Sequence, residues 1–300
     1  QLTINELDAA SSLVPDAKSY NITDVGSTVN YNKNGNLDLS SQLLGKGTFV
    51  FDGDSDDTAQ STLEFVGTAN TGGTFEGTVE LRDAYLDLDK DATKNTDALT
   101  NATLKASKNS TVDVGKGTQN IGALDFNAGT VNFGTITMND GLNDNNVAVT
   151  DLNLGSGNVQ ITVGGDDDTG LPSSKPLLEQ DDANMTTQLV ASVNEVTGDV
   201  NNLKLIDEDG EDVPDPVGIM ISQDGEDVAR ASYGTDLTTG ADNKGLYVVM
   251  GLTQVELKVA NNHDIDTGNA LKLDATGKTD KAAELTAKLT DFENEDGTYT

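Results

Sequence analysis

The feature that most constrains this 300-residue chain is a short strand pattern that recurs along its length. Each copy begins with a small or polar residue, often Thr, and then has apolar residues at alternate positions. Because successive side chains of a strand point to opposite faces, each copy predicts a strand with one buried face and one wet face. Gly, Asn or Asp bound most copies, and these residues favour turns. The clearest copies are Thr48-Phe49-Val50-Phe51, Thr62-Leu63-Glu64-Phe65, Thr78-Val79-Glu80-Leu81, Thr111-Val112-Asp113-Val114, Thr130-Val131-Asn132-Phe133 and Asn158-Val159-Gln160-Ile161.

Two all-β architectures fit this pattern: an antiparallel sandwich or barrel, and a parallel β-solenoid. A sandwich core usually contains buried aromatic residues and longer strands, whereas aromatic residues make up 4% of this chain and Trp is absent. The Thr-led copies follow one another at intervals of roughly 14 to 28 residues, which approximates one solenoid coil with loops of variable length. The sequence therefore predicts an all-β parallel β-helix, in which each strand stacks on its equivalent about 4.8 Å away.

The chain is strongly acidic, with 51 Asp and Glu against 18 Lys and Arg and a formal net charge of −33. Nucleic-acid binding requires a surface of Lys and Arg, and anionic lipid attracts the same residues, so neither partner is expected. The sequence has no apolar run of 18 residues, so no membrane insertion is expected. The acidity itself has two interpretations: solubility through self-repulsion, or a surface for cations and cationic partners.

The composition changes after Gly164, where acidic loops begin to interrupt the strand pattern. We expect a single domain over residues 1–300, with regular coils over 1–165 and coils with longer acidic loops over 166–300. These loops are looped insertions in the C-terminal half of the β-helix. They provide the candidate binding residues, which are Asp166, Asp167, Asp168, Asp207, Glu208 and Asp209.

Catalytic groups are scarce in this sequence. It has one histidine, His263, two arginines, Arg82 and Arg230, and no Gly-x-Ser-x-Gly motif around a nucleophile. Paired carboxylates can hydrolyse glycosides, but carboxylates are so abundant here that no particular pair stands out. We therefore expect no enzymatic activity and no cofactor.

One segment partly follows the pattern of a calcium loop. Asp52, Asp54 and Asp56 alternate as in the first half of an EF-hand loop. The sixth position, which requires Gly, is Asp57, and the twelfth position, which requires Glu, is Leu63. We expect no metal site, and loose Ca²⁺ coordination by the acidic loops is the alternative.

Four phrases from Thr187 onward are distinctive: Thr187-Gln188-Leu189-Val190, Val196-Thr197-Gly198-Asp199-Val200, Asn243-Lys244-Gly245-Leu246-Tyr247-Val248-Val249-Met250-Gly251-Leu252 and Leu271-Lys272-Leu273-Asp274-Ala275-Thr276-Gly277. In these phrases the chain resembles the passenger domains of AIDA-like enterobacterial autotransporter adhesins, which use type V secretion. The rest of the chain is similar in the style of its coils. The resemblance implies a right-handed β-helix displayed on the outer membrane that mediates cell aggregation, biofilm formation or adhesion to host matrix. The family's C-terminal translocation barrel has no counterpart here, as expected of a passenger fragment.

The leading hypothesis is thus a bacterial cell-surface adhesin passenger, exported through the periplasm. Its expected partners are host matrix proteins or glycans, or identical passengers on neighbouring cells, bound by many weak contacts along a polar face. The lack of Cys agrees with export, because no disulfide can trap the chain in the periplasm. The alternatives are a structural stalk that projects a distal tip and, third, a β-helix enzyme that acts on polysaccharides.

Overall fold

A computed structural model describes residues 1–6, 19–53, 61–88, 97–136, 142–163, 184–213, 216–223, 226–257 and 271–274. These residues confirm the all-β class, with a mostly parallel sheet and almost no helix. The chain divides into two compact units, which are described separately: the first comprises Gln1–Val163, Thr186–Val213 and Leu237–Val248, and the second comprises Gly164–Met185, Pro214–Asp236 and Val249–Thr300. The expectation of a single domain over 1–300 stays a prediction.

The secondary structure of the described residues consists of strands and one short 3-10 helix. In the part of the chain that the structure describes, no helix is long and apolar enough to cross a membrane. The elements are β1 (Leu2–Glu6), β2 (Ser19–Ile22), β3 (Thr28–Lys33), β4 (Leu37–Leu39), β5 (Gln42–Gly45), β6 (Thr48–Asp52), β7 (Ser61–Phe65), β8 (Thr78–Arg82), β9 (Ala84–Asp87), β10 (Thr103–Ala106), β11 (Thr111–Asp113), β12 (Gly117–Ile136), β13 (Leu142–Val163), β14 (Asn184–Ser192), β15 (Thr197–Gly198), η1 (Val200–Asn202), β16 (Leu203–Ile206), β17 (Val217–Gln223), β18 (Glu226–Thr238), β19 (Gly245–Leu257) and β20 (Leu271–Asp274).

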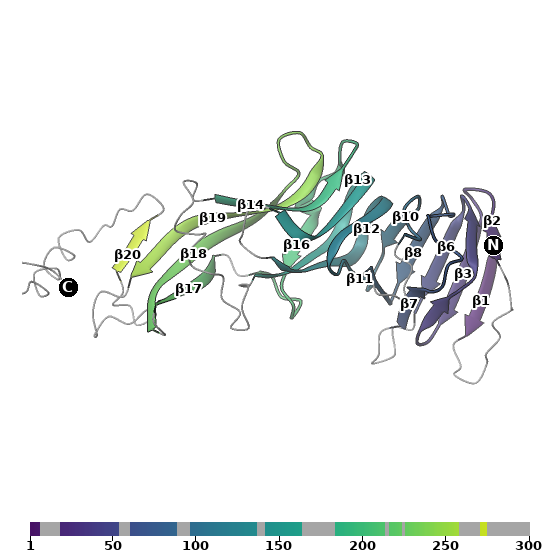
Figure 1. The fold of residues 1–300 in the computed structure, drawn as a ribbon, viewed down its shortest axis with the longest axis horizontal. Coiled ribbons are helices and arrows are strands. Elements are labelled where there is room, and N and C mark those ends of the chain that lie inside the picture. Colours follow the sequence, from purple (N-terminus) through teal and green to yellow (C-terminus); the bar gives the residue numbers. More distant parts are fainter. Residues whose placement is uncertain are drawn as a thin grey trace, which may run out of the picture. The chain divides into compact units, whose positions relative to one another are not determined.

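In the first unit, parallel strands stack into columns (Figure 1). The first column contains β1, β3, β6, β8, β10 and central parts of β12 and β13. Its strands are in register on their leading threonines: Thr28 lies opposite Thr48, Thr48 opposite Thr78, and Thr78 opposite Thr103. The Thr-led sequence pattern therefore marks structurally equivalent positions.

A second column contains β4, β7, β9, β11, later parts of β12 and β13, and β16. Thr62 belongs to this column, whereas Thr48 belongs to the first. The copies at Thr48, Thr62 and Thr78 therefore alternate between columns, whereas those at Thr111, Thr130 and Asn158 stack directly on one another in the second column. The intervals of roughly 14 to 28 residues between copies thus mix steps within a column with steps between columns.

The core lies beneath the alternating apolar side chains of these strands. Phe49, Phe51 and Leu104 are fully buried, as are Phe126 and Phe133 further along the stack. Burying one such side chain contributes roughly 1.5–3 kcal/mol before the cost of ordering the chain. The outward-facing residues between them are therefore held on a rigid, apolar support.

The corners between columns contain residues that bond to backbone groups or that adopt backbone conformations closed to most residues. Asn70 is 2% exposed, donates to the carbonyl of Ser41 at 3.1 Å and accepts from the amide of Leu43 at 2.7 Å. Gly45 has a φ of 94°, and a Cβ at this position would collide with the carbonyl of Ile22. Polar and Gly residues in the turns are thus structural requirements of this stack.

The second unit pairs its strands antiparallel. β17 runs against β18, with Val217 opposite Tyr233, and β19 runs against β20, with Leu257 opposite Leu271. The sequence suggested parallel coils here as well. Because two residues separate β17 from β18, that connection can join antiparallel strands but cannot make a parallel crossover.

Candidate functional site: the polar face of the first column

The outward face of the first column brings together charged residues from strands far apart in sequence. Glu80 of β8 lies directly opposite Lys105 of β10, and Lys105 lies opposite Asp125 of β12. Asp125 in turn lies opposite Asn153 of β13. The order along this face is therefore carboxylate, ammonium, carboxylate and amide.

Glu80 is the centre of the most connected polar cluster on this face. Its Oε1 accepts from Nε of Arg82 at 2.9 Å and from Oγ of Ser107 at 3.0 Å, and Nζ of Lys105 lies 3.9 Å away. Glu80 is 7% exposed, although it stands on the outward face. We call this set, together with Asn127, the Glu80 network.

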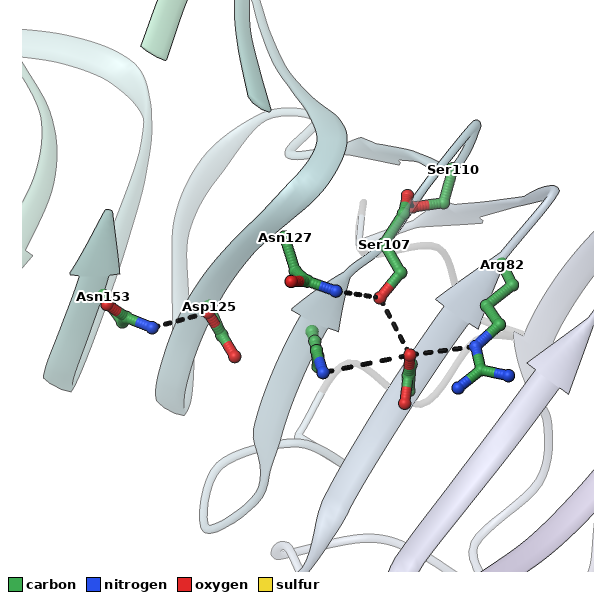
Figure 2. Close-up of polar contacts among 8 residues, drawn as sticks. Arg82, Ser107, Ser110, Asp125, Asn127 and Asn153 are labelled. Carbon is green, nitrogen blue, oxygen red and sulfur yellow. Dashed lines mark hydrogen bonds and ion pairs between the residues drawn. The ribbon is translucent and has the colours of Figure 1, made fainter. Parts of the chain in front are cut away.

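Ser107 connects three strands through one hydroxyl group. Its Oγ donates to Glu80 and accepts from Nδ2 of Asn127 at 3.0 Å. Figure 2 shows the amide of Asn127 directed at the Ser107 hydroxyl, and Ser107 and Arg82 both bonded to the carboxylate between them. Ser110 ends the same turn, where its Oγ donates to the carbonyl of Ser107 at 2.5 Å. The Glu80 network therefore depends on the relative positions of β8, β10 and β12.

The environment of Glu80 stabilises its charge. Burial has the largest single influence and by itself raises the pKa of Glu80. The hydrogen bonds from Arg82 and Ser107, with the charges of Lys105 and Arg82, together outweigh it and hold the pKa below its ordinary value. Glu80 is thus an ionised structural acceptor at neutral pH.

Asp125 has the opposite balance. Burial raises its pKa, and Glu80 adds to this, while the hydrogen bond from Asn153 and the charge of Lys105 oppose it. Nδ2 of Asn153 donates to Asp125 at 2.8 Å (Figure 2), and Oγ1 of Thr197 donates to Oδ1 of Asn153 at 3.2 Å. A line of hydrogen bonds therefore continues from β12 through β13 to β15.

The second column carries stacked carboxylates on its outward face. Asp38 lies opposite Glu64, and Asp87 lies opposite Asp113. The stack ends in amides, since Asp113 lies opposite Asn132 on its other side. We call Asp38, Glu64, Asp87 and Asp113 the acidic column.

Neutral donors surround the last carboxylate of the acidic column. Asp113 accepts from the hydroxyl of Tyr85 at 3.1 Å, from Nδ2 of Asn132 at 3.4 Å and from the amide of Gly115 at 3.1 Å. Burial, followed by the charge of Asp113, raises the pKa of Tyr85, so its hydroxyl remains a donor. These contacts with neutral donors hold the carboxylate in place.

The predicted binding loops fall into two groups. Asp207 is half-buried, and its Oδ1 accepts from the amides of Asp209 and Glu211, each at 3.0 Å, so this loop closes on itself. Glu208 and Asp209 are exposed. The residues Asp166, Asp167 and Asp168 lie outside the described part of the chain. A binding role for either loop stays a prediction.

Of the three weak metal candidates, the structure describes one. Asp52 is half-buried and lies opposite Arg82, and its pKa is raised by burial, with Asp83 and Glu80 adding to the effect of burial and Arg82 opposing it. Asp54 and Asp56 lie outside the described residues. Among the residues that the structure does describe, no group of three or more His, Cys, Asp or Glu side chains is arranged to hold a metal ion.

Sequence reasoning missed the Glu80 network and the acidic column. A usable signal was present, because aligning strands on Thr78 and Thr103 places Glu80 and Lys105 at the same position. The assignment of strands to columns was missing, and without it the neighbours of Glu80 cannot be identified.

Chemically, the site offers fixed donors and acceptors rather than a free acid or base. The acceptor oxygen of Glu80 is already shared among several donors, and Asp125 is bonded to Asn153. General acid–base catalysis requires a group within reach of a substrate proton, not one committed to neighbouring strands. The arrangement is suited to presenting polar groups in rows.

Comparison with known proteins gives two relatives from Escherichia coli (strain K12). The chain is 36% identical over 295 residues to the uncharacterized protein YuaQ, and the matched region is 89% of this chain and 21% of YuaQ. It is 33% identical over 206 residues to the uncharacterized lipoprotein YdeK, and here the matched region is 62% of this chain and 15% of YdeK. The chain thus spans about a fifth or less of the length of these relatives. No protein-family model matches it, and no solved structure matches it.

Proposed function

We propose that this chain is a passenger segment of a bacterial surface adhesin of the AIDA-like autotransporter type, folded as a right-handed parallel β-helix. It works by many weak contacts along its sides. The observation that carries this proposal is the in-register stacking of outward polar residues on neighbouring parallel strands. A partner that lies along such a face meets a polar group about every 4.8 Å, and multiplicity then supplies strength that no single contact has.

The relatives support the envelope part of the proposal. One of them is called a lipoprotein, which agrees with a location in the cell envelope. We place this chain more specifically on the cell surface, after export through the periplasm. Its small share of both relatives agrees with a segment of a longer protein.

The proposed partners are host matrix proteins or glycans, or identical segments on neighbouring cells. The acidic column favours a cationic ligand, because Asp38 and Glu64 stand directly opposite each other on adjacent strands. Contact between two copies of a chain with a net charge of −33 requires screening of their mutual repulsion. The two kinds of partner therefore respond oppositely to salt.

A structural stalk is the second candidate, and one observation favours it. The polar residues of the first column bond mainly to each other, as in the contacts of Glu80 with Ser107 and of Asp125 with Asn153. A face whose groups are mutually satisfied gains less from a partner than a face with free groups. The polysaccharide-active enzyme is a weaker alternative, because the same contacts occupy the carboxylates that it would use.

The test is to display this chain on the surface of a non-adherent bacterium. Cell sedimentation would measure aggregation, and binding to immobilised matrix proteins and glycosaminoglycans would measure adhesion. Both would be followed from about 0.05 to about 0.5 M NaCl, over which the screening length falls several-fold. We expect adhesion to a cationic ligand to weaken with salt, and association between copies to strengthen.

Matched variants identify the face that is used. Asp38→Asn with Glu64→Gln removes two charges from the acidic column, and Glu195→Gln with Glu211→Gln removes two from exposed loop positions. Loss of cationic-ligand binding in the first pair but not in the second would support the acidic column. If display produces neither aggregation nor adhesion at any salt concentration, the stalk replaces the adhesin. Hydrolysis of a polysaccharide that one carboxylate substitution abolishes would favour the enzyme.

A further inference from the structure

The inward apolar pattern does not by itself fix how the strands of the first column align. Sliding a strand by one residue exchanges its buried and exposed faces, which the core forbids. Sliding it by two residues keeps every apolar side chain inside. For β10 on β8, such a slip moves Leu104 from Val79 to Leu81, another fully buried apolar residue. Some other feature must therefore select the observed register.

The outward residues oppose one of the two possible slips. In the observed register Lys105 lies between Glu80 and Asp125. The two-residue slip would move Lys105 opposite Arg82 on one side and, with β12 in place, opposite Asn127 on the other. Two favourable cross-strand pairs would thus be replaced by one pair of like charges and one pair without opposite charges. The slip in the other direction would move Leu104 opposite Gly77, which has no side chain to pack against it. One slip is thus opposed by charge and the other by packing.

The same logic applies to the strand on the other side of β8. Asp52 of β6 lies opposite Arg82. A two-residue slip that brings Asp52 opposite Glu80 would place two carboxylates side by side. The charges of β8 therefore favour the observed register over a two-residue slip of either neighbouring strand.

Burial makes the discrimination stronger for Glu80 than for an ordinary surface charge. Glu80 is 7% exposed, and its donors Ser107 and Lys105 come from the neighbouring strand and the turn that follows it. The slip that brings Lys105 to Arg82 carries Ser107 away as well. A buried carboxylate that loses such donors is destabilised far more than an exposed one.

We propose that the Glu80 network, with Asp125, is a register lock: it selects one alignment of β6, β8, β10 and β12 from the alignments that the apolar pattern permits. Asp125 extends the lock toward β13 through its bond from Asn153. Buried polar groups have this role in some other proteins, where they contribute specificity more than stability. The proposal is independent of the adhesin function.

The absence of Cys from this sequence permits a direct test. Thr78 and Thr103 lie directly opposite each other, so Thr78→Cys with Thr103→Cys places two thiols within disulfide range. Asn101 is offset by two residues, about 8 Å from Thr78 across the pair, which is too far for a disulfide. In the slipped register Asn101 lies opposite Thr78, so Thr78→Cys with Asn101→Cys reports the slip.

Each reporter pair would be refolded from denaturant under oxidising conditions in the whole chain, and the disulfide yield measured. With Lys105 intact, we expect the Thr78–Thr103 reporter to close and the Thr78–Asn101 reporter to stay open. Lys105→Glu introduces repulsion with Glu80 and attraction to Arg82 in the slipped register. We expect it to raise the ratio of slipped to native disulfide roughly tenfold or more. Lys116→Glu, an exposed position with the same charge change, is the matched control and should leave the ratio unchanged.

A milder variant covers the case in which Lys105→Glu does not refold. Lys105→Met removes the attraction without adding repulsion, and we expect an intermediate ratio. Parental ratios in every Lys105 variant that folds would overturn the proposal, even if those variants were less stable, because the network would then stabilise the fold without selecting its register. A rise in the ratio with Lys116→Glu would overturn it too, since net charge alone would then explain the effect.

Discussion

The substitution Glu80→Gln isolates what the charge of one buried carboxylate contributes. The amide keeps an acceptor oxygen and nearly the same shape, so packing is preserved. A hydrogen bond to a charged group contributes about 1.5–3 kcal/mol and one between neutral groups about 0.5–1.5 kcal/mol. Glu80 has two such bonds, from Arg82 and Ser107. Because the Arg82 side chain is 45% exposed, its share is discounted, and we expect a loss of about 2 kcal/mol at neutral pH.

The pH dependence of this loss provides the sharper test. The folded-state pKa of Glu80 lies below its ordinary value, so the unfolded chain binds the proton more readily. Its contribution is therefore present above the ordinary carboxyl pKa and is lost as the pH falls through that value toward the lower folded-state pKa. Urea denaturation of the parent and of Glu80→Gln should give midpoints that differ at pH ~7 and converge below pH ~4.

Glu76→Gln is the control for this measurement. Glu76 pairs with Lys46 at 3.2 Å, but both side chains are more than half exposed, so its substitution should change stability by less than about 0.5 kcal/mol. Equal midpoints for the parent and Glu80→Gln at neutral pH would refute the reasoning. So would a difference that persists unchanged in acid, because shape and not charge would then be responsible.

Three further predictions concern single positions. Asp125→Asn should leave stability unchanged or raise it by up to about 1 kcal/mol at neutral pH, because burial raises the pKa of Asp125 and so disfavours its ionised form in the folded chain. Thermal melts at neutral and at acid pH should show that any such gain vanishes in acid. Phe126→Ala should cost about 3–5 kcal/mol in urea denaturation, since Phe126 is fully buried in the core. Gly45→Ala should cost more than about 1 kcal/mol, because φ is positive there and a Cβ meets the carbonyl of Ile22; a melting temperature equal to the parent's would contradict this.

The individual strands could be predicted from sequence because each depends on local alternation. The copies that begin at Thr48, Thr78 and Thr111 coincide with β6, β8 and β11. The inward positions also follow, since Phe49 and Phe51 are two residues apart and both buried, but the prediction of a wet outer face was wrong for Val50 and Glu80, which are buried too. Period-two patterning is a property of a few neighbouring residues and needs no tertiary information.

The stacking partners could not be predicted in the same way. Thr48 lies opposite Thr78, although the Thr62 copy stands between them in sequence. Which copies share a column depends on where the chain turns, and those turns depend on corner residues such as Asn70 and Gly45. The partners of Glu80 follow from the columns, so the site could be recognised only once the stacking was known.

Hydrogen bonds from Asn amides to Asp carboxylates determine how the salt experiment should be interpreted. Asn109, Asn153 and Asn194 each donate to an Asp of a preceding strand or turn at 2.8 Å, in bonds to Asp83, Asp125 and Asp151. An amide carries no net charge, so salt screens these contacts much less than it screens exposed ion pairs. The stack should therefore keep its structure across the salt series that tests adhesion. A change in adhesion or aggregation over that series then reports contact between molecules, and unchanged circular dichroism over the same series is the observation on which that interpretation depends.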